Sequence, residues 1–243
     1  KAAGKYTNGI DESDDMDTNW QDVLFGNAGS TQHNLSVSGG NEKSLYRLSV
    51  GYMYDDSTLK WGNNNNKRFN VRLTNTVKLT DRFTIESVMA YNRQDQVSPT
   101  MIDRVLTSSY PQPGLPSSTM DGKPYHWGGN YTPNWYAELG GDNKLKVSGI
   151  NISENLKYQF TSYLDAVVNL GYNTSTATRD GVKNSITWYT YDGTLSTAKT
   201  NAINNPNQAS TEYSKSFART DYYSVSGYLN YHQTLGEKHN VTA

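Results

Sequence analysis

The chain has 243 residues, of which only 35% are apolar. A soluble globular domain usually has about 45–50% apolar residues, so we do not expect a large buried core. The formal net charge of −1 leaves no basic field for nucleic acid, and no nucleic-acid partner is expected. Because the chain has no cysteine, a disulfide framework, a thiolate nucleophile and a cysteine-bound zinc are all excluded.

The first part of the chain, residues 1–30, is polar, and we expect an irregular linker there. Acidic side chains gather between Asp11 and Asp17, but this stretch lacks the glycine and the final glutamate of a calcium loop. We therefore interpret it as solvated and expect no bound metal. Residues 31–243 carry the regular patterning and form the second part.

From residue 33 onward, apolar and polar residues alternate in one segment after another, as they do in half-exposed strands. The connections are alternately short and long, and the long ones cover 55–66, 96–148 and 180–215. Tight turns at one end and long extracellular loops at the other are typical of a transmembrane β-barrel. The expected strands are 33–39, 46–54, 68–79, 83–91, 150–160, 164–172 and 223–231, with another beginning near the C-terminus.

These features predict an all-β fold, specifically an antiparallel up-and-down transmembrane β-barrel segment of about eight strands. No run approaches the roughly 18 consecutive apolar residues of a spanning helix. Passage through a membrane would therefore be by strands, with the lipid bilayer as a partner.

Each expected strand has one apolar stripe, because side chains alternate between the two faces of a strand. The aliphatic middle of the stripe is expected to face lipid: Leu48, Val50, Val71, Leu73, Val168, Leu170 and Val225. Aromatic rings gather at both ends, as at the two interfaces of a membrane barrel. They are Tyr52, Phe69, Tyr91, Tyr172 and Tyr223 near the long loops, and Tyr46, Phe83, Tyr158, Phe160 and Tyr231 near the short turns.

The opposite stripe is polar and charged, which is unsuitable for a dry core and fits a watery or plugged lumen. Its charged members include Arg47, Arg72, Lys78, Glu86, Lys157 and Asp165. A soluble β-sandwich would alternate too, but its inner face has no reason to place rings at both ends. The arrangement of rings therefore favours a barrel over a sandwich.

Several strings resemble the early barrel of SusC/RagA-type TonB-dependent outer-membrane transporters. They are Thr18-Asn19-Trp20-Gln21-Asp22-Val23-Leu24-Phe25, the stretch from His33 to Lys43, residues 46–52 and the hairpin over 67–85. The likeness is strong over residues 18–95. Beyond residue 95 it consists of pattern and turn placement.

This resemblance implies a barrel of about 22 strands with an N-terminal plug, located in the outer membrane of a Gram-negative bacterium. Its expected function is active import of oligosaccharides or peptides. It also implies two partners, a SusD-like surface lipoprotein over the extracellular mouth and the TonB complex acting on the plug. The plug is not in this sequence, so we expect an internal fragment of a longer protein. No cofactor is implied.

The loop over 96–148 combines many aromatic rings with prolines, among them Pro111, Pro113, Pro116, Pro124 and Pro133, which favours an ordered loop. Flat rings can contact the apolar face of a sugar, or they can pack the loop on itself or against the partner lipoprotein. Both interpretations stay open. The candidate substrate- or partner-contacting residues are Tyr110, Tyr125, Trp127, Tyr131, Trp135 and Tyr136, with Trp188 from the next long loop. Residues 101–106 are expected to form one helical turn.

Catalysis has little support in the sequence. The four histidines lack metal-ligand spacing, and there is no nucleophile elbow or phosphate loop. We expect neither catalytic residues nor enzyme activity. Two alternative functions are a secreted or surface lectin-like β-sandwich, which binds glycans without transport, and a passive porin, which lacks the plug.

Overall fold

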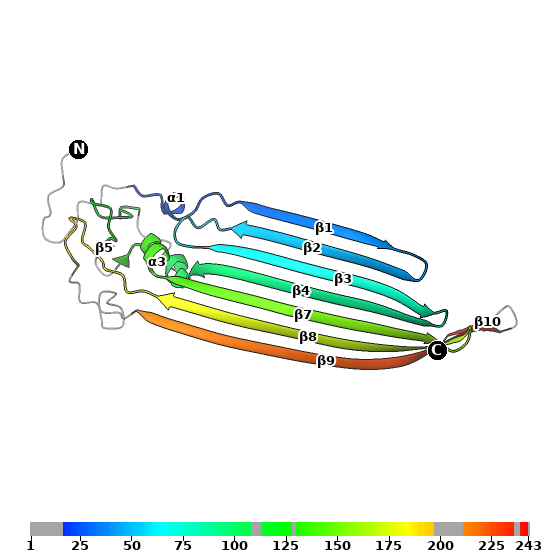
Figure 1. The fold of residues 1–243 in the computed structure, drawn as a ribbon. Coiled ribbons are helices and arrows are strands. Elements are labelled where there is room, and N and C mark those ends of the chain that lie inside the picture. The colour runs from blue at the N-terminus through cyan, green and yellow to red at the C-terminus, as the bar shows by residue number, and fades with distance from the viewer. Residues whose placement is uncertain (1–16, 108–112, 128–129, 197–210, 236–238, 243) are drawn as a thin grey trace.

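The structure is a computed structural model that describes residues 17–107, 113–127, 130–196, 211–235 and 239–242. These residues form an eight-stranded antiparallel sheet in the order β1-β2-β3-β4-β7-β8-β9-β10 (Figure 1). The strands are β1 Ser30–Gly40, β2 Ser44–Asp56, β3 Asn65–Thr80, β4 Phe83–Pro99, β7 Asp142–Gln159, β8 Leu164–Lys183, β9 Glu212–Leu235 and β10 His239–Thr242. The predicted up-and-down antiparallel arrangement of about eight strands is confirmed.

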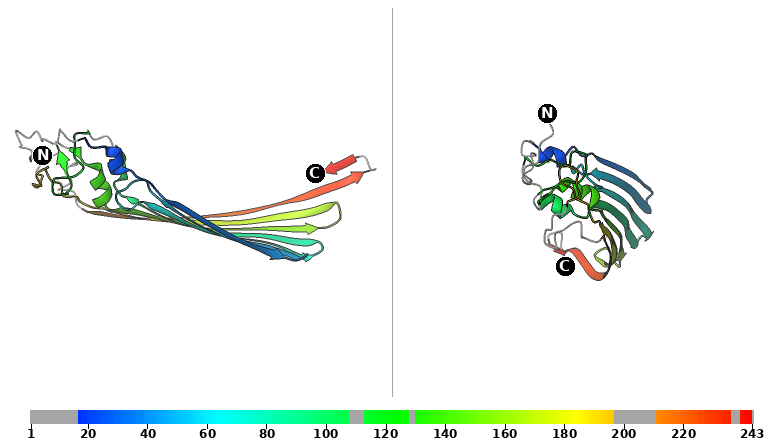
Figure 2. Two further views of the ribbon diagram at one scale, coloured as in Figure 1. Left: turned by 90° about the horizontal axis from the view of Figure 1, so that it is seen from above. Right: turned by 90° about the vertical axis from the view of Figure 1, so that its left-hand side faces the viewer.

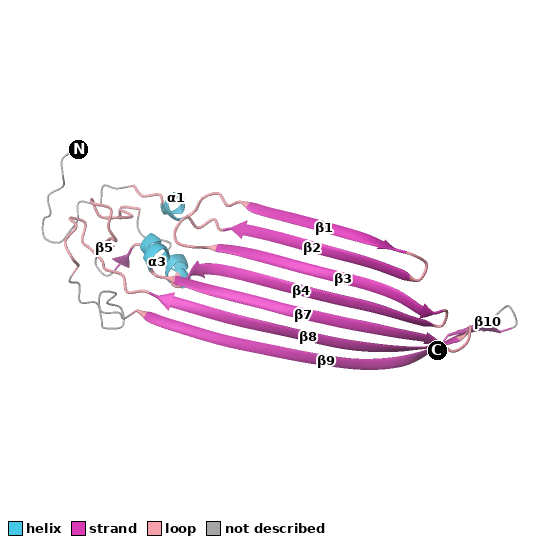
Figure 3. Cartoon of the chain, viewed as in Figure 1, coloured by secondary structure: helices cyan, strands magenta, loops and turns pink. Residues whose placement is uncertain are grey.

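The sheet is a single curved and twisted layer, with the helices and long loops at one end and the tight turns at the other (Figures 2 and 3). The second sheet of the described ranges is a two-stranded pair at the loop end, β5 His126–Trp127 with β6 Asn130–Tyr131, which is too short to cover the large sheet. Leu48 is 41% exposed and Val168 is 39% exposed, so the apolar stripe is not enclosed in a core. A β-sandwich would cover this stripe with its second sheet.

Several strands extend farther toward the long loops than the alternation predicted. The predicted loops 96–148 and 180–215 begin and end inside strands, since β4 continues to Pro99, β7 begins at Asp142 and β8 continues to Lys183. The reason is chemical. Beyond Tyr172 the outer stripe of β8 becomes polar, with Thr174 and Thr176, so the backbone ladder continues where the apolar signal has stopped.

The hairpin turns at the opposite end are tight. In the β1–β2 turn, the Asn41 side chain accepts hydrogen bonds from the backbone N–H groups of Lys43 and Ser44, both at 2.9 Å. Gly40 has φ of +152°, and a Cβ there would approach the Ser44 carbonyl oxygen to 2.1 Å. Glycine is therefore required at this corner.

Three short helices lie at the loop end: α1 Trp20–Leu24, α2 Ile102–Thr107 and α3 Pro133–Leu139. The Asn19 side chain caps α1 by accepting from the N–H groups of Gln21 and Asp22. Residues 17–30 are therefore not the irregular linker expected, because α1 forms there and buries Trp20 and Leu24. The helical turn expected over 101–106 corresponds to α2. None of the helices described is long and apolar enough to cross a membrane.

The cluster of buried hydrophobic residues lies at the loop end, where α1, the β2–β3 loop and the two longest loops meet, and Val167 of β8 is buried apart from it. We call this cluster the loop-end core. Its buried residues are Trp20, Leu24, Leu59, Val105, Leu115, Tyr125, Tyr136, Ala137, Ile186 and Trp188. The sheet itself contributes no residue to this cluster, so the loop end and the strands are stabilised by different contacts.

Candidate functional site

The strand register aligns the apolar stripes of neighbouring strands. Directly opposed residues project on the same face of a sheet. One row of opposed residues is Val37, Leu48, Leu73, Met89, Ile152, Tyr172 and Tyr223. The stripes therefore merge into one continuous apolar band, which we call the outer band.

Tyrosines bound the outer band at both ends of its strands. The bounding rings are Tyr46 and Tyr54 on β2, and Tyr223 and Tyr231 on β9. The β9 residue in the same row as Tyr46 is Val225, which lies six residues before Tyr231. The β2 residue in the same row as Tyr223 is Leu48, which lies six residues before Tyr54. Both margins therefore shift toward the turns by the same amount between β2 and β9.

If the two margins of the outer band mark the surfaces of a flat layer such as a membrane, this shift gives the angle between the strands and the normal of that layer. It amounts to six residues across the five spacings between β2 and β9. With about 3.3 Å per residue and 4.8 Å between strands, the strands tilt by about 40° from the normal of that layer. Strands of membrane barrels tilt by about 35–45°.

Rings at both margins contact one another, across strands in two pairs and along the chain at the end of β7 in a third. Near the long loops, Tyr172 and Tyr223 stack with centroids 4.9 Å apart. Near the turns, Phe83 and Tyr158 lie 6.3 Å apart, and Tyr158 and Phe160 form an edge contact at 4.9 Å. Such pairs stabilise neighbouring strands beyond the area they bury.

Beyond the margin near the long loops, the same face becomes charged. Arg93 pairs with Asp95, and Arg219 pairs with Asp221, each at 2.9 Å. The Tyr172 hydroxyl donates to Asp221 at 3.1 Å. Hydrated ion pairs of this kind belong in water, so the change from rings to ion pairs gives the band a sharp boundary.

The outer band contains one polar interruption. Asn75, Ser87 and Glu154 share a row, and the Ser87 hydroxyl donates to the Glu154 carboxylate at 2.5 Å. Apolar rows lie on both sides, one of them through Ile85 and Leu156. The interruption therefore lies inside the band rather than at its margin.

The opposite face of the sheet is rich in amides, and we call it the inner face. Asn34, Asn70 and Asn92 lie in one row, with Gly51 between Asn34 and Asn70 and with Gly149 next to Asn92. A Cβ at Gly51 would approach the Asn70 amide to 2.7 Å, and one at Gly149 would approach Asn92 Oδ1 to 2.8 Å. The glycines thus leave room for amide side chains to lie along the sheet.

Three charged residues on the inner face of β4, β7 and β8 have polar partners. Buried Asp165 accepts from Asn230 at 3.0 Å and lies 3.7 Å from the Lys157 ammonium. Glu86 accepts from Asn155 at 3.1 Å. The inner face is therefore hydrophilic and hydrogen-bonded rather than a dry core.

The seven aromatic candidates of the long loops do not form one exposed surface. Tyr125, Tyr136 and Trp188 are buried in the loop-end core, where the rings of Tyr136 and Trp188 meet at 5.2 Å. In this structure these three rings pack within the loop end itself, and the assignment of the seven candidates to substrate or partner contact stays a prediction. Sequence composition alone does not distinguish buried rings from exposed ones.

Among the other aromatic candidates of the long loops, Trp135 is partly buried. Its indole N–H donates to the Ser117 carbonyl at 2.8 Å, and its ring lies 5.7 Å from that of Trp61. Tyr110 lies outside the described residues, as do the side chains of Trp127 and Tyr131. Trp61, from the β2–β3 loop, was not anticipated, because it stands alone in a polar stretch.

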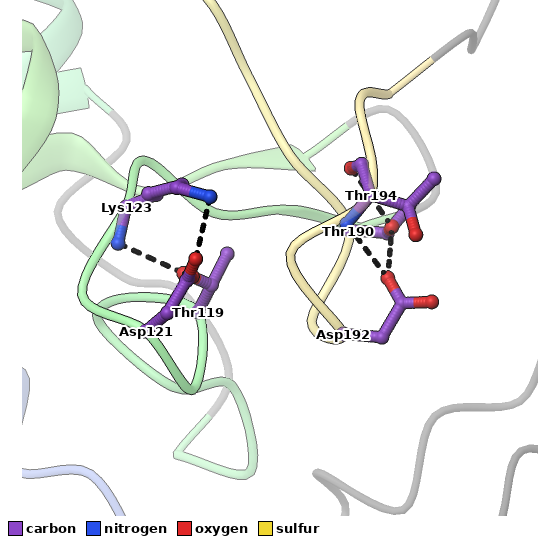
Figure 4. Close-up of polar contacts among 6 residues, drawn as sticks. All are labelled: Thr119, Asp121, Lys123, Thr190, Asp192 and Thr194. Atoms are coloured by element: carbon purple, nitrogen blue, oxygen red, sulfur yellow. Dashed lines mark hydrogen bonds and ion pairs between the residues drawn. The ribbon is translucent and has the colours of Figure 1, made fainter.

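Two loop tips lie next to each other (Figure 4), and the backbone N–H of Met120 in one donates to the Tyr191 carbonyl of the other. In one, Asp121 accepts from Thr119 at 2.6 Å and contacts the Lys123 ammonium at 2.5 Å. In the other, Asp192 accepts from the hydroxyl of Thr190 and the backbone N–H of Thr194. Hydrogen bonds from Lys123 and from Thr190 lower the pKa of Asp121 and Asp192, respectively. These contacts hold the turns locally. Among the residues that the structure describes, no group of three or more potential ligands is placed to hold a metal ion.

His126 is a titratable group in the interior of this end, with 5% of its surface exposed. Its Nδ1 lies 3.1 Å from the Ser196 hydroxyl, and burial lowers the pKa of the imidazole from its ordinary value of 6.5. The folded state therefore favours the neutral ring. Protons bind more readily to the unfolded segment as the pH falls below 6.5, so stability is lost on acidification.

We expect the loop end to become more susceptible to protease as the pH falls from about 7.5 to about 5. His126→Asn, which keeps a polar atom near Ser196, should remove most of this pH dependence. The measurement is limited proteolysis of the protein in detergent at both pH values, with an acid-tolerant protease. The same acid sensitivity in wild type and variant would assign the effect to other groups.

No family model matches the sequence. Over 46 residues, which are 19% of this chain and 5% of its counterpart, the sequence is 44% identical to the TonB-dependent receptor SusC of Bacteroides thetaiotaomicron. In fold, the chain is similar to the RagAB peptide importer in the closed-closed state, with a TM-score of 0.70 and 15% identity over 98% of this chain and 26% of the other. A structure of the RagAB peptide transporter matches with a TM-score of 0.69 and 16% identity over 94% and 25%.

The chain thus spans about a quarter of the solved chains it matches. At this level of identity the structural likeness concerns the fold, and the eight-stranded sheet has the fold of part of the matched RagAB chain. Together with the SusC match, it confirms the resemblance to SusC/RagA-type barrels seen in the sequence motifs. The matched proteins are named as a receptor, importers and transporters, which is consistent with a chain that is not an enzyme.

Proposed function

We propose that this chain is part of the barrel wall of a TonB-dependent importer in a Gram-negative outer membrane, with the outer band against lipid and the inner face lining the lumen. The observation that carries the proposal is the parallel shift of the two aromatic margins, which gives the strands the tilt of a membrane barrel. In this assignment residues 31–243 are barrel, and the long loops are extracellular.

The proposal gives each expected surface residue a position in the membrane. Aliphatic side chains contact acyl chains, and the rings at the two margins lie at the interfaces, where Tyr keeps its hydroxyl in water. The expected assignments are unchanged: Leu48, Val50, Val71, Leu73, Val168, Leu170 and Val225 for lipid, and Tyr46, Tyr52, Phe69, Phe83, Tyr91, Tyr158, Phe160, Tyr172, Tyr223 and Tyr231 for the interfaces.

For cargo we propose oligosaccharides or peptides. RagAB is named a peptide importer, and the amide-rich inner face suits both classes, because amides donate to and accept from hydroxyl and peptide groups. We propose two partners, a SusD-like surface lipoprotein at the loop end and the TonB complex, which would act through a plug outside this chain. Trp135 remains a candidate contact at the loop end.

Uptake by the full-length protein that contains this segment tests the proposal. We expect accumulation of labelled oligosaccharide or peptide to require both this protein and TonB, and the protein to fractionate with the outer membrane. Uptake that persists without TonB would favour a passive porin. A full-length protein that stays soluble without detergent would contradict the barrel and favour the lectin-like alternative.

The polar interruption provides a further prediction about the outer band. A carboxylate among lipid-facing residues is unfavourable, so Glu154→Leu should stabilise the barrel by roughly 1 kcal/mol. Glu86→Leu is the matched control, since Glu86 lies on the inner face and accepts from Asn155, and it should give no gain. Unfolding in denaturant, followed by heat-modifiable electrophoretic mobility, measures both. A loss of stability in Glu154→Leu would argue against lipid at this position.

A further inference from the structure

The inner face of β2 and β3 differs from the rest of the sheet in its charge. β3 presents Arg68, Arg72 and Lys78 there, and β2 presents Arg47. The acidic residue on the inner face of these two strands is Asp55, which lies at the loop end and accepts from Ser30 at 2.5 Å. Away from the loop end, this part of the inner face is cationic although the whole chain has a net charge of −1.

Two of these cations are close neighbours. Arg47 is opposite Thr74 on β3, and Arg72 is opposite Ser49 on β2. They are therefore diagonal neighbours on one face, with Cα atoms roughly 7–8 Å apart. Long side chains at this spacing can reach the same ligand.

Neither guanidinium is neutralised by a carboxylate of the residues that the structure describes. Among the ion pairs of the described residues, none involves Arg47 or Arg72. This differs from Lys157, which has Asp165 beside it. Both arginine residues are exposed.

The surroundings of the two arginines are small and hydroxylated, which leaves space above the sheet for a ligand. The residues directly opposite Arg47 are Ser38 and Thr74, and those directly opposite Arg72 are Ser49 and Ala90. Hydroxyl groups can add hydrogen bonds to an anion held by a guanidinium. No carboxylate is directly opposite either arginine.

We propose that Arg47 and Arg72 form a binding site for carboxylate groups of an anionic substrate passing along the lumen. This inference rests on the proposed function, because it takes the inner face as the lumen wall. A guanidinium binds a carboxylate through two parallel N–H donors, which gives orientation as well as attraction. The site is open to water, so each contact is weak, and weak binding permits release and onward movement.

The carboxylate has two possible sources among the proposed cargo classes, an acidic sugar or an acidic peptide. The probes are therefore a galacturonate oligosaccharide and a glutamate-containing peptide. Each is compared with a neutral analogue of the same length. Binding is measured by calorimetry on the full-length transporter in detergent.

The test variant is Arg47→Gln with Arg72→Gln. The control is Lys67→Gln with Arg93→Gln, which removes two positive charges from the opposite face. We expect the test variant to bind a carboxylate probe about tenfold more weakly, to bind neutral probes as wild type does, and to lose this difference at high salt. Heat-modifiable mobility checks that both variants are folded.

If the test variant loses binding of only one acidic probe, the result supports the site and identifies the class of substrate that carries the carboxylate. If it loses binding of both acidic probes, the result supports carboxylate recognition in general. Unchanged binding in the test variant overturns the inference, as does an equal loss in the control. Failure of wild type to bind either acidic probe also overturns it. The proposed function is judged separately by membrane fractionation and TonB-dependent uptake, so it can stand when this site fails.

Discussion

We expect Val168→Arg to destabilise the intact barrel by about 2–4 kcal/mol, whereas Asn169→Arg costs much less. The two residues are adjacent in β8 but project on opposite faces. Val168 is in the middle of the outer band, opposite Leu156 and Gly227, and has no polar neighbour in its row on β7 or β9. An arginine there must bring its charge into hydrocarbon or distort the strand to reach water.

Asn169 provides the matched control on the inner face. It is opposite Asn155 and Ser226, and its amide donates to the Ser226 hydroxyl at 3.4 Å. A charge added there remains hydrated if the inner face lines a lumen. Denaturant unfolding of the full-length protein in lipid vesicles measures both variants. Equal destabilisation would contradict the assignment of the faces.

The second large effect is expected at the loop end. Trp188 is 0% exposed and contacts Tyr136 within the loop-end core. Trp188→Ala should therefore remove about 3–5 kcal/mol from the stability of this cluster. Because the sheet contributes no residue to the cluster, the strands should stay paired while the loops loosen.

Limited proteolysis and heat-modifiable mobility separate these two parts. In Trp188→Ala we expect rapid cleavage between residues 100 and 141 with the mobility of a folded barrel. Leu195→Ala, at a position 54% exposed in the same loop, should behave as wild type. Loss of barrel mobility in Trp188→Ala would show that the strands depend on the loop-end core, which contradicts the independence expected of the two parts.

Much of the sheet follows from the sequence because strand periodicity is local. Alternation along β2 and β3 predicted which residues share a face, and the register then placed Leu48 opposite Leu73. The strand ends were harder to predict. The ladder of β8 continues through Thr174 and Thr176, and polar residues in a solvated strand resemble a loop in sequence.

The loop end was less predictable because its contacts join distant segments. Tyr125 pairs with Tyr189 in an isolated parallel bridge, and Lys60 donates its backbone N–H to Leu24. No local pattern indicates such contacts. Aromatic composition predicted order in these loops, but not that Tyr125 and Trp188 would be interior.

The closeness of Arg47 and Arg72 also depends on the register between β2 and β3. Each arginine alone is an ordinary polar position on an alternating strand. Only the pairing of β2 with β3 makes them diagonal neighbours among small side chains. A shift of one residue would put them on opposite faces, so the sequence without the sheet does not predict the site.

Cysteine labelling tests the central claim most directly, since the chain has no native cysteine. Val168→Cys and Asn169→Cys are each introduced into the full-length protein, in a background without other cysteines, and outer membranes are treated with a membrane-impermeant maleimide. We predict that the thiol at position 169 reacts, and that the thiol at position 168 reacts only after denaturation. Equal labelling at both positions in intact membranes, or faster labelling at position 168, would contradict a lipid-facing outer band and a watery inner face.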